Sequence, residues 1–277
     1  MVCVSYICKC NLLLQNSNKH MVNQRFFVKK DRKMQTIQAL TWVDFLLLGI
    51  IAVVMPLYGY WSTSQLKKDV AAGRKIELKP FYRETILFLW APTIVLLAYW
   101  LYEGRSFSDL GLMYAGTVAN WIGLAVAVLV AVPLLLQVKN VQSKKEAATA
   151  HVSAFEEVPF VAAILPKRED DYQLFKLVSV TAAVTEEILF RGFLIWGFSF
   201  FMDTWMAAGL ALVAFVLGHL YQNNGKVLLQ VALTGLGFTL LYLLSGSLLP
   251  AVLTHGIIDL TIGASYWYAV KNTAVTA

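Results

Sequence analysis

Residues 185–193 read TEEILFRGF and lie inside an apolar run, residues 174–201, that is long enough to cross a bilayer as a helix. Two adjacent carboxylates, Glu186 and Glu187, and one arginine, Arg191, are therefore expected near the middle of a transmembrane helix. Charged side chains at that depth are costly to bury and usually take part in function. These three residues therefore predict a functional site inside the membrane, completed by polar residues on other helices.

The composition of the 277-residue chain is that of a polytopic membrane protein. Hydrophobic residues make up 58% of the chain and charged residues 14%, and apolar runs long enough to span the hydrocarbon core recur. Backbone groups in a bilayer must be paired within helices, and the sequence shows no alternating segments typical of barrel strands. The net charge of +6 is attributed to basic loops that face anionic lipid, not to nucleic-acid binding. The sequence predicts an all-α bundle of about seven transmembrane helices.

The seven predicted spans are separated by short turns rich in Gly, Asn, Ser and Asp. Several spans end in Trp or Tyr, which is typical of the membrane interface. The spans cover about residues 42–61, 85–102, 118–138, 174–201, 205–221, 227–244 and 249–268. In terms of domains, we distinguish an N-terminal extension, three N-terminal spans, a cytoplasmic loop, and the transmembrane core that carries the charged motif: residues 1–33, 34–138, 139–172 and 173–277.

Basic residues in the loops predict the orientation of the chain. They number six in loop 62–84, one in loop 103–117 and five in loop 139–172, so the first and third of these loops are expected in the cytoplasm. This orientation puts the N-terminus outside, where a basic run at residues 25–33 fits poorly, and we therefore expect translation to begin at Met34. The three cysteines all lie in the first ten residues and indicate neither a disulfide framework nor a metal site.

Residue spacing separates the roles of the two adjacent carboxylates. Glu187 and Arg191 are four residues apart with the glutamate first, which is the favourable order for an ion pair on a helix. Glu186 is turned by about 100° to another face of the same helix. One carboxylate is therefore expected to be neutralised by the arginine, and the other is free for chemistry.

The turn at Asp203 predicts that Glu186 and His219 lie at the same depth. Glu186 stands 17 residues before this turn and His219 stands 16 residues after it. In an antiparallel pair of helices both residues lie roughly 25 Å from the turn. A glutamate that faces a histidine in a low-dielectric cavity is a general-base arrangement, in which the imidazole holds a water and the carboxylate takes its proton.

The last predicted span adds His255 and Asp259, which share one helix face and could supply hydrogen bonds to a developing oxyanion. The distance of His255 from the nearest turn does not agree with this arrangement. His255 lies about 13 Å from the turn at Gly246, so straight helices leave it shallower than Glu186. A short or re-entrant sixth helix, or tilted helices, would be needed to bring the two residues together.

Less specific roles compete with catalysis. A lone intramembrane histidine often makes only an interhelical hydrogen bond, and a Glu–Arg pair alone often packs helices or lines a transport path. Phe190, Phe193 and Phe215 are expected in the core. A set of two Glu, one Arg, two His and one Asp on three helices favours an enzyme. The alternatives are a non-catalytic immunity or scaffold protein, and a proton-coupled transporter that uses Glu186 as its carrier but lacks the usual internal repeats.

Three motifs in this order resemble those of the CPBP family of intramembrane proteases, which includes type II CAAX prenyl endopeptidases and bacteriocin-processing or self-immunity proteins. The motifs E-E-x-x-x-R, F-x-x-x-H and H-x-x-x-N/D are matched by Glu186, Glu187 and Arg191, by Phe215 and His219, and by His255 and Asp259. The resemblance covers about residues 160–268, with Pro166 and Phe175 also placed as in the family. It implies an endopeptidase in a bacterial cytoplasmic membrane that acts on a peptide, lipopeptide or membrane-protein substrate.

The resemblance also implies a role for each matched residue. The implied roles are general base for Glu186, water activation for His219, the oxyanion site for His255 and Asp259, and structural support for Glu187, Arg191 and Phe215. The prenyl endopeptidases have Asn where this chain has Asp259. Asn donates a hydrogen bond outright, whereas Asp must be protonated or must act by orienting His255. Cleavage of prenylated peptides is therefore implied less strongly than proteolysis in general.

A metal is the main alternative for the implied mechanism. The family was long described as metal-dependent, and Glu186, His219 and His255 make a plausible set of zinc ligands. However, the sequence contains no H-E-x-x-H, and the two histidines come from separate helices. We therefore expect a glutamate mechanism without a cofactor, with zinc as the alternative.

Overall fold

The computed structural model describes residues 40–222 and 224–274, and every regular element in these ranges is helical. The predicted all-α fold is confirmed. The chain divides into two units, residues 1–46 and 47–277. In the first unit, the N–H of Thr41 donates a 2.8 Å hydrogen bond to Asp44 Oδ2 at the start of helix α2. The predictions for the N-terminal extension and its three cysteines lie outside the described residues.

Each of the seven predicted spans corresponds to one helix or to a continuous run of helical segments. Two segments, η2 and η4, are π-helices, and η3 and η5 are short 3-10 helices. In chain order the elements are α2 (Trp42–Gly49), η2 (Ile50–Val54), α3 (Met55–Ala71), α4 (Leu78–Tyr102), η3 (Phe107–Leu110), α5 (Val118–Ser143), α6 (Lys145–Glu156), α7 (Pro159–Ile164), α8 (Glu169–Glu186), η4 (Glu187–Leu194), α9 (Ile195–Phe198), α10 (Thr204–Gly218), η5 (Leu220–Gln222), α11 (Gly225–Ser245) and α12 (Leu249–Ala274).

Five helical runs in the described part of the chain are long and apolar enough to cross a membrane. They are Trp42–Ala71, Leu78–Tyr102, Val118–Ser143, Thr204–Gln222 and Gly225–Ser245. The run from α8 to α9 and helix α12, which hold two of the three motifs, fall outside this set, and both carry charged residues within their apolar stretches. The protein is thus a polytopic helical membrane protein, and the number of seven spans stays a prediction.

Three predicted turns end or begin helices through their polar and glycine residues. Asp203 Oδ1 accepts hydrogen bonds from the N–H groups of Trp205 and Met206, which caps the start of α10. Asn224 caps the start of α11 in the same way. Gly246 ends α11 with a φ of +70°, a left-handed conformation that glycine adopts without strain. These turns set the lengths of the helices that carry the motif residues.

Residues 139–172, predicted as a loop, are largely helical. Helix α5 continues to Ser143, and α6 and α7 fill most of the remaining segment. The sequence of α6, KEAATAHVSAFE, is rich in residues with a high helix propensity, a signal that hydropathy alone does not report. Helix α6 is joined to α12 by a 2.9 Å hydrogen bond between His151 Nε2 and Ser265 Oγ.

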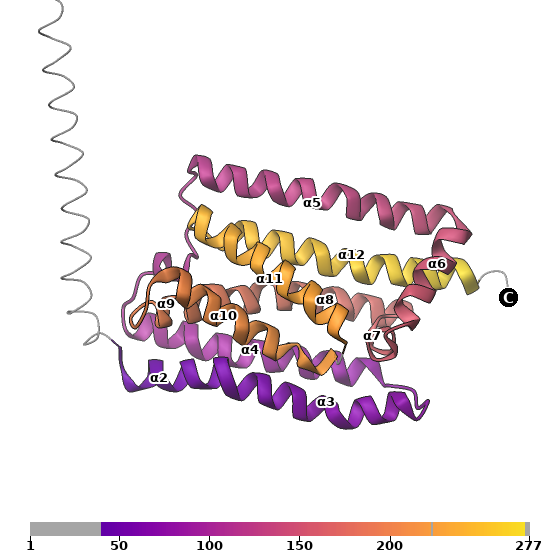
Figure 1. Cartoon of the computed structure of the whole chain (residues 1–277), viewed down its shortest axis with the longest axis horizontal. Coiled ribbons are helices and arrows are strands. Elements are labelled where there is room, and N and C mark those ends of the chain that lie inside the picture. Colours follow the sequence, from indigo (N-terminus) through magenta and orange to yellow (C-terminus); the bar gives the residue numbers. More distant parts are fainter. Residues whose placement is uncertain (1–39, 223, 275–277) are drawn as a thin grey trace, which may run out of the picture. The chain divides into compact units, whose positions relative to one another are not determined.

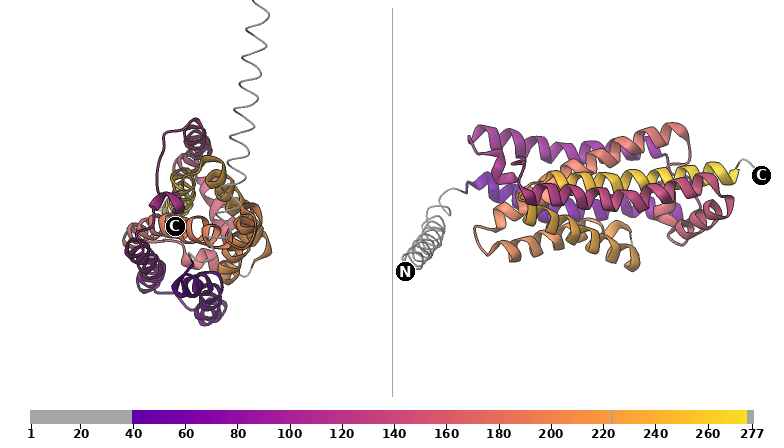
Figure 2. Two further views of the ribbon diagram at one scale, coloured as in Figure 1. Left: turned by 90° about the vertical axis from the view of Figure 1, so that its left-hand side faces the viewer. Right: turned by 90° about the horizontal axis from the view of Figure 1, so that it is seen from above.

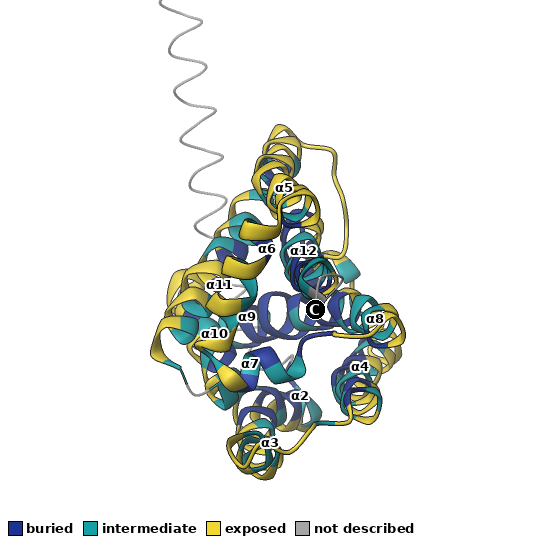
Figure 3. Ribbon diagram, turned by 90° about the vertical axis from the view of Figure 1, so that its right-hand side faces the viewer, coloured by how far each residue is buried: buried dark blue, intermediate teal, exposed yellow. Residues whose placement is uncertain are grey.

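In the second unit the long helices run side by side along a common direction (Figures 1 and 2). Helix α12 packs against α5, α6, α8 and α11, and α8 also packs against α4. Large apolar side chains such as Leu87, Trp121 and Leu129 are exposed on the outside, whereas Glu187 and Arg191 are buried. Buried positions face the middle of the bundle and exposed positions lie outward (Figure 3). An apolar exterior around buried charges is typical of a protein that has lipid as its solvent.

Candidate active site

The two adjacent glutamates lie where the helix changes its geometry. Helix α8 ends at Glu186, and the eight residues from Glu187 to Leu194 form the π-helix η4, whose side chains are all buried. The sequence predicted an uninterrupted α-helix here, because apolar patterning reports burial but does not distinguish i+4 from i+5 hydrogen bonding. π-helical segments are rare and are frequent at functional sites.

The buried carboxylate of Glu187 joins two helices. Its Oε1 atom accepts hydrogen bonds from Arg191 Nη1 at 3.1 Å and from His255 Nδ1 at 2.9 Å. The Glu187 and Arg191 side chains are 0% and 1% exposed, so the ion pair predicted from their spacing is confirmed, in a fully buried setting. Because Arg191 lies on η4 and His255 on α12, Glu187 fixes these two elements to each other.

His255 lies between two carboxylates. Its Nδ1 faces Glu187, and its Nε2 lies 3.5 Å from Asp259 Oδ2. Carboxylate oxygens only accept hydrogen bonds, so a doubly protonated imidazolium serves both neighbours. In that form the positive charges of Arg191 and His255 balance the negative charges of Glu187 and Asp259, and the adjacent Glu186 lies outside this balanced network.

The figures explain how His255 reaches the level of Glu187 despite the length mismatch. Helix α11 has 21 residues, so a short sixth helix is not the reason. The turn after α9 lies further out along the bundle than the turn between α11 and α12 (Figures 1 and 2). His255 is therefore close to its own turn and still level with a residue that is more distant from the α9 turn.

Aromatic rings and one glycine hold Arg191 in place. Arg191 Nη2 donates a 3.0 Å hydrogen bond to the carbonyl oxygen of Gly235. The guanidinium carbon lies 4.1 Å from the ring centre of Phe215 and 5.5 Å from that of Phe238, within cation–π range. Phe238 also stacks on the His255 ring at 4.8 Å. The sequence named Phe215 as a supporting residue but gave no signal for Phe238 or Gly235, which belong to no polar motif.

His219 lies in the turn after α10 and not inside the helix, as the predicted span 205–221 had implied, because α10 ends at Gly218. Its Nδ1 lies 2.8 Å from the carbonyl oxygen of Phe215. A carbonyl oxygen can only accept, so Nδ1 carries a proton, and in the neutral ring Nε2 is an acceptor. The His219 ring also packs against the rings of Phe215 and Tyr221.

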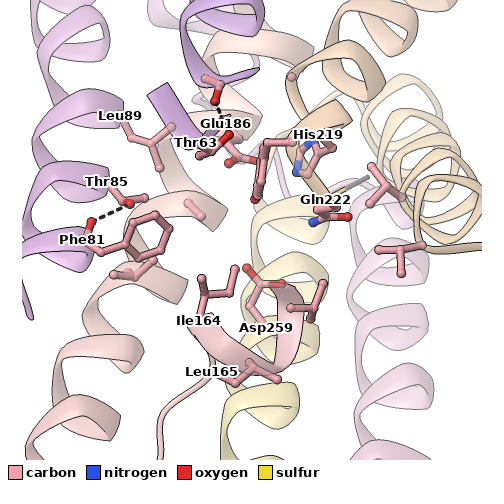
Figure 4. A pocket seen from close by; sticks show the side chains of 18 of the residues that line it. Thr63, Phe81, Thr85, Leu89, Ile164, Leu165, Glu186, His219, Gln222 and Asp259 are labelled. Atoms are coloured by element: carbon pink, nitrogen blue, oxygen red, sulfur yellow. Dashed lines mark hydrogen bonds between the residues drawn. The ribbon is translucent and has the colours of Figure 1, made fainter. Parts of the chain in front are cut away.

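A cavity of about 2070 Å³ brings the motif residues to a common space. Its walls are mainly apolar, and the polar side chains from the motifs that line it are Glu186, His219, His255 and Asp259, together with Gln222. Figure 4 shows Glu186, His219, Gln222 and Asp259 around this space, with apolar side chains on either side. The volume exceeds the 300–1,000 Å³ or so that is typical of small-molecule pockets, so the cavity has room for a segment of a chain.

The side chains named as possible zinc ligands are not gathered around one point. Among residues 40–222 and 224–274, no group of three His, Cys, Asp or Glu side chains is placed to hold a metal ion. His219 Nδ1 faces a backbone carbonyl and His255 Nδ1 faces a carboxylate, which are contacts that histidines make both with and without a metal on the other nitrogen. A glutamate mechanism without a cofactor stays our prediction, with zinc at Glu186, His219 and His255 as the alternative.

The fold and the buried network define a polytopic membrane protein with a polar site inside an apolar helical bundle. Residues 168–261 match the model of the family described as type II CAAX prenyl endopeptidase Rce1-like. These residues run from α8 into α12 and hold all three motifs, so the resemblance to CAAX-type intramembrane proteases is confirmed over this part of the chain. Comparisons with curated proteins and with solved structures gave no match.

Proposed function

We propose that this protein is an intramembrane endopeptidase in which Glu186 and His219 activate the water that hydrolyses the peptide bond. One observation carries the proposal. Glu186 lies outside the charge-balanced network of its neighbours, and its Oε2 atom is buried at the cavity without a hydrogen-bond partner among the described residues. No Lys, Arg or His of the described residues forms an ion pair with Glu186 within 4 Å, although His219 and His255 act on it at longer range. A buried carboxylate without a close ion pair is a strong proton acceptor, which is the property that a general base needs.

The tautomer of His219 supports a defined orientation of the water. With its proton on Nδ1, held by the Phe215 carbonyl, His219 presents Nε2 to the cavity as an acceptor. A water between Glu186 and His219 then donates one O–H to each side chain. Both protons point toward the protein, so the lone pairs of the water oxygen are left for the carbonyl carbon of the substrate.

The proposed reaction needs only the water and the peptide. Glu186 takes one proton as the water oxygen attacks the carbonyl carbon, which forms a tetrahedral oxyanion. The protonated Glu186 gives this proton to the leaving nitrogen as the C–N bond breaks, which regenerates the carboxylate. The products are a carboxylic acid and an amine, and no other reactant is consumed.

His255 and Asp259 are proposed to serve the oxyanion together. A positively charged His255 has an N–H on Nε2, on the side where Asp259 lies at the cavity. The side chain of Asp259 is 31% exposed, and its position beside Nε2 favours a role in orienting His255 over direct donation by a protonated acid. Glu187 and Arg191 hold His255 from the opposite side.

The proposed substrate is a peptide, lipopeptide or membrane protein whose scissile bond enters the cavity from the membrane, and the proposed location is a bacterial cytoplasmic membrane. The apolar walls of the cavity are compatible with an acyl or prenyl chain as well as with apolar side chains. Asp259 in place of Asn favours proteolysis in general over cleavage that requires a prenylated cysteine.

The test is a cleavage assay on detergent-purified protein, with a peptide and lipopeptide library read by mass spectrometry. Wild type, Glu186→Gln and His219→Ala are compared, with Glu84→Gln as the matched control, because Glu84 also lines the cavity but is exposed. We expect cleavage to be lost in the first two variants and retained in the control. Removal of one catalytic acid or base typically lowers the rate by about 10²–10⁴-fold.

Two outcomes would contradict the proposal. Cleavage that survives Glu186→Gln would remove the general base from the mechanism. Cleavage that is abolished by a chelator and restored by zinc would favour a metalloenzyme. An immunity or scaffold role predicts instead that Glu186→Gln complements a deletion phenotype as well as the wild type does.

A further inference from the structure

We propose that Gln222 is a substrate-positioning residue, whose side-chain oxygen accepts a hydrogen bond from a backbone N–H of the peptide next to the scissile bond. This inference rests on the proposed function and adds a residue that none of the three motifs contains. It follows from the local geometry of the chain after His219 and from the number of hydrogen-bond acceptors at the cavity.

The 3-10 helix η5 places Gln222 on the same side as His219. The N–H of Gln222 donates to the carbonyl oxygen of His219 at 3.0 Å, as expected for residues three positions apart in such a turn. Side chains at positions i and i+3 of a 3-10 helix eclipse each other. Figure 4 shows the two side chains together at the wall of the cavity, opposite Glu186.

The side-chain amide of Gln222 lies beside the Tyr221 hydroxyl, but its oxygen has no hydrogen bond among the described residues. Its Oε1 atom is buried and makes no hydrogen bond to any residue that the structure describes. Gln222 and Glu186 are the two cavity-lining residues with such an oxygen. A buried acceptor that is left unpaired costs about 1–3 kcal/mol, so this oxygen at the cavity wall is suited to accept from a donor in the cavity.

The attacking water cannot fill this role as well. Besides Asp259, which is paired with His255, three motif or neighbouring acceptors line the cavity in the proposed mechanism: the Glu186 carboxylate, His219 Nε2 and Gln222 Oε1. A water has two O–H groups, and both are used by Glu186 and His219. The third acceptor is left for a donor on the substrate, and a peptide carries one N–H on almost every residue. Because the backbone N–H is the donor that nearly all substrates share, we assign this contact to the peptide backbone.

The variants are chosen to separate this contact from packing. Gln222→Met keeps an unbranched side chain of similar length but removes the acceptor, and Gln222→Glu keeps acceptor oxygens but removes the NH₂ group. Gln230→Met is the matched control, because Gln230 lines the same cavity and is exposed. We expect Gln222→Met to lower kcat/KM by about 5- to 100-fold, Gln222→Glu to keep more activity than Gln222→Met, and the control to change little.

The decisive measurement is a cycle that combines these variants with N-methylated substrates. The peptide that wild type cleaves in the library is remade with one backbone N–H at a time replaced by N–CH₃. We expect one position, next to the scissile bond, at which N-methylation slows wild type by at least about fivefold more than it slows Gln222→Met. A role in packing alone does not couple to a single N–H of the substrate.

The same cycle can also overturn the inference. If N-methylation slows wild type and Gln222→Met by the same factor at every position, the inference is wrong. Thermal unfolding in detergent shows whether Gln222→Met is folded, and Gln222→Glu and Gln222→Asn carry the cycle if it is not. Glu186→Gln in the same assay tests the proposed function separately. If this variant keeps its activity, Glu186 is not the general base, whereas the coupling between Gln222 and the N-methylated position is still measured by the cycle.

Discussion

Gly235 packs closely against the groups around Arg191, and this contact makes a sharp prediction. A Cβ atom at position 235 would lie 2.9 Å from Leu212 Cδ1, 3.0 Å from Phe215 Cδ1 and 3.1 Å from Arg191 Nη2. At Gly237, two residues further along the same helix, a Cβ would meet nothing within 4 Å. Gly235→Ala and Gly237→Ala therefore add the same methyl group to α11, once against the network and once into open space.

The expected difference follows from two terms. Both substitutions gain up to about 1 kcal/mol because alanine forms helices better than glycine does. Only Gly235→Ala also carries the strain of overpacking, typically about 1–3 kcal/mol. The helix term is common to both variants, so the free energy of unfolding should be about 1–3 kcal/mol lower for Gly235→Ala than for Gly237→Ala. At about 2–4 °C per kcal/mol, the Tm values should differ by about 2–12 °C.

The assay is thermal unfolding of the two variants in the same detergent, followed by the peptide cleavage assay. We expect Gly235→Ala to lose cleavage as well as stability, because the methyl group displaces the Arg191 guanidinium from the Gly235 carbonyl and so disturbs the position of His255. Equal Tm values and equal activities for the two variants would refute the reasoning that Arg191 is held at this point.

Three further predictions concern other parts of the network and helix α6. Arg191→Lys should lower the free energy of unfolding by about 1–3 kcal/mol in thermal unfolding, because one ammonium cannot reach both partners of the guanidinium; an unchanged Tm would contradict this. Asp259→Asn should raise the ratio of farnesylated to unmodified peptide cleaved, since it restores the residue of the prenyl endopeptidases. An unchanged ratio would show that the residue at position 259 does not determine the preference for prenylated substrates. Burial lowers the pKa of His151 from its ordinary 6.5, so its contribution to stability is complete above pH 6.5 and is lost as the pH falls through the lowered pKa. Unfolding measured against pH should become flatter below pH 6.5 in His151→Gln, and an identical pH profile would show that this histidine does not titrate on unfolding.

The positions of the long helices along the chain could be predicted from the sequence, because exposure to lipid requires apolar residues throughout each helix. A helix that faces lipid needs a long apolar run, and a turn between such helices needs capping and glycine residues, so Asp203 and Gly246 could be placed without a structure. Helices α6 and α7 were not predicted, because neither contains an apolar run long enough to cross a membrane. The π-helical geometry of η4 is invisible for a different reason, since the same buried residues suit either helix type.

The site was predicted as far as its contacts depend on spacing within one helix. The ion pair of Glu187 with Arg191 and the proximity of His255 to Asp259 both follow from an interval of four residues. The contact of Glu187 with His255 depends instead on how far two turns extend along the bundle, which no local pattern records. Phe238 takes part only through its position against the Arg191 and His255 side chains, so it looks like any other core residue in the sequence.

The π-helix η4 also has a consequence for insertions and deletions in this segment. A π turn holds one residue more than an α turn between groups that are stacked along the axis. Removing one residue from within Glu187–Leu194 would let the segment close into an ordinary α-helix without breaking the span. Every side chain beyond the deletion would then rotate relative to Glu186. The aromatic cluster of Phe193 and Trp196 would keep its composition but face a different neighbour. The extra residue therefore sets the rotation of the part of this helix that carries Glu186 relative to the part that packs into the bundle.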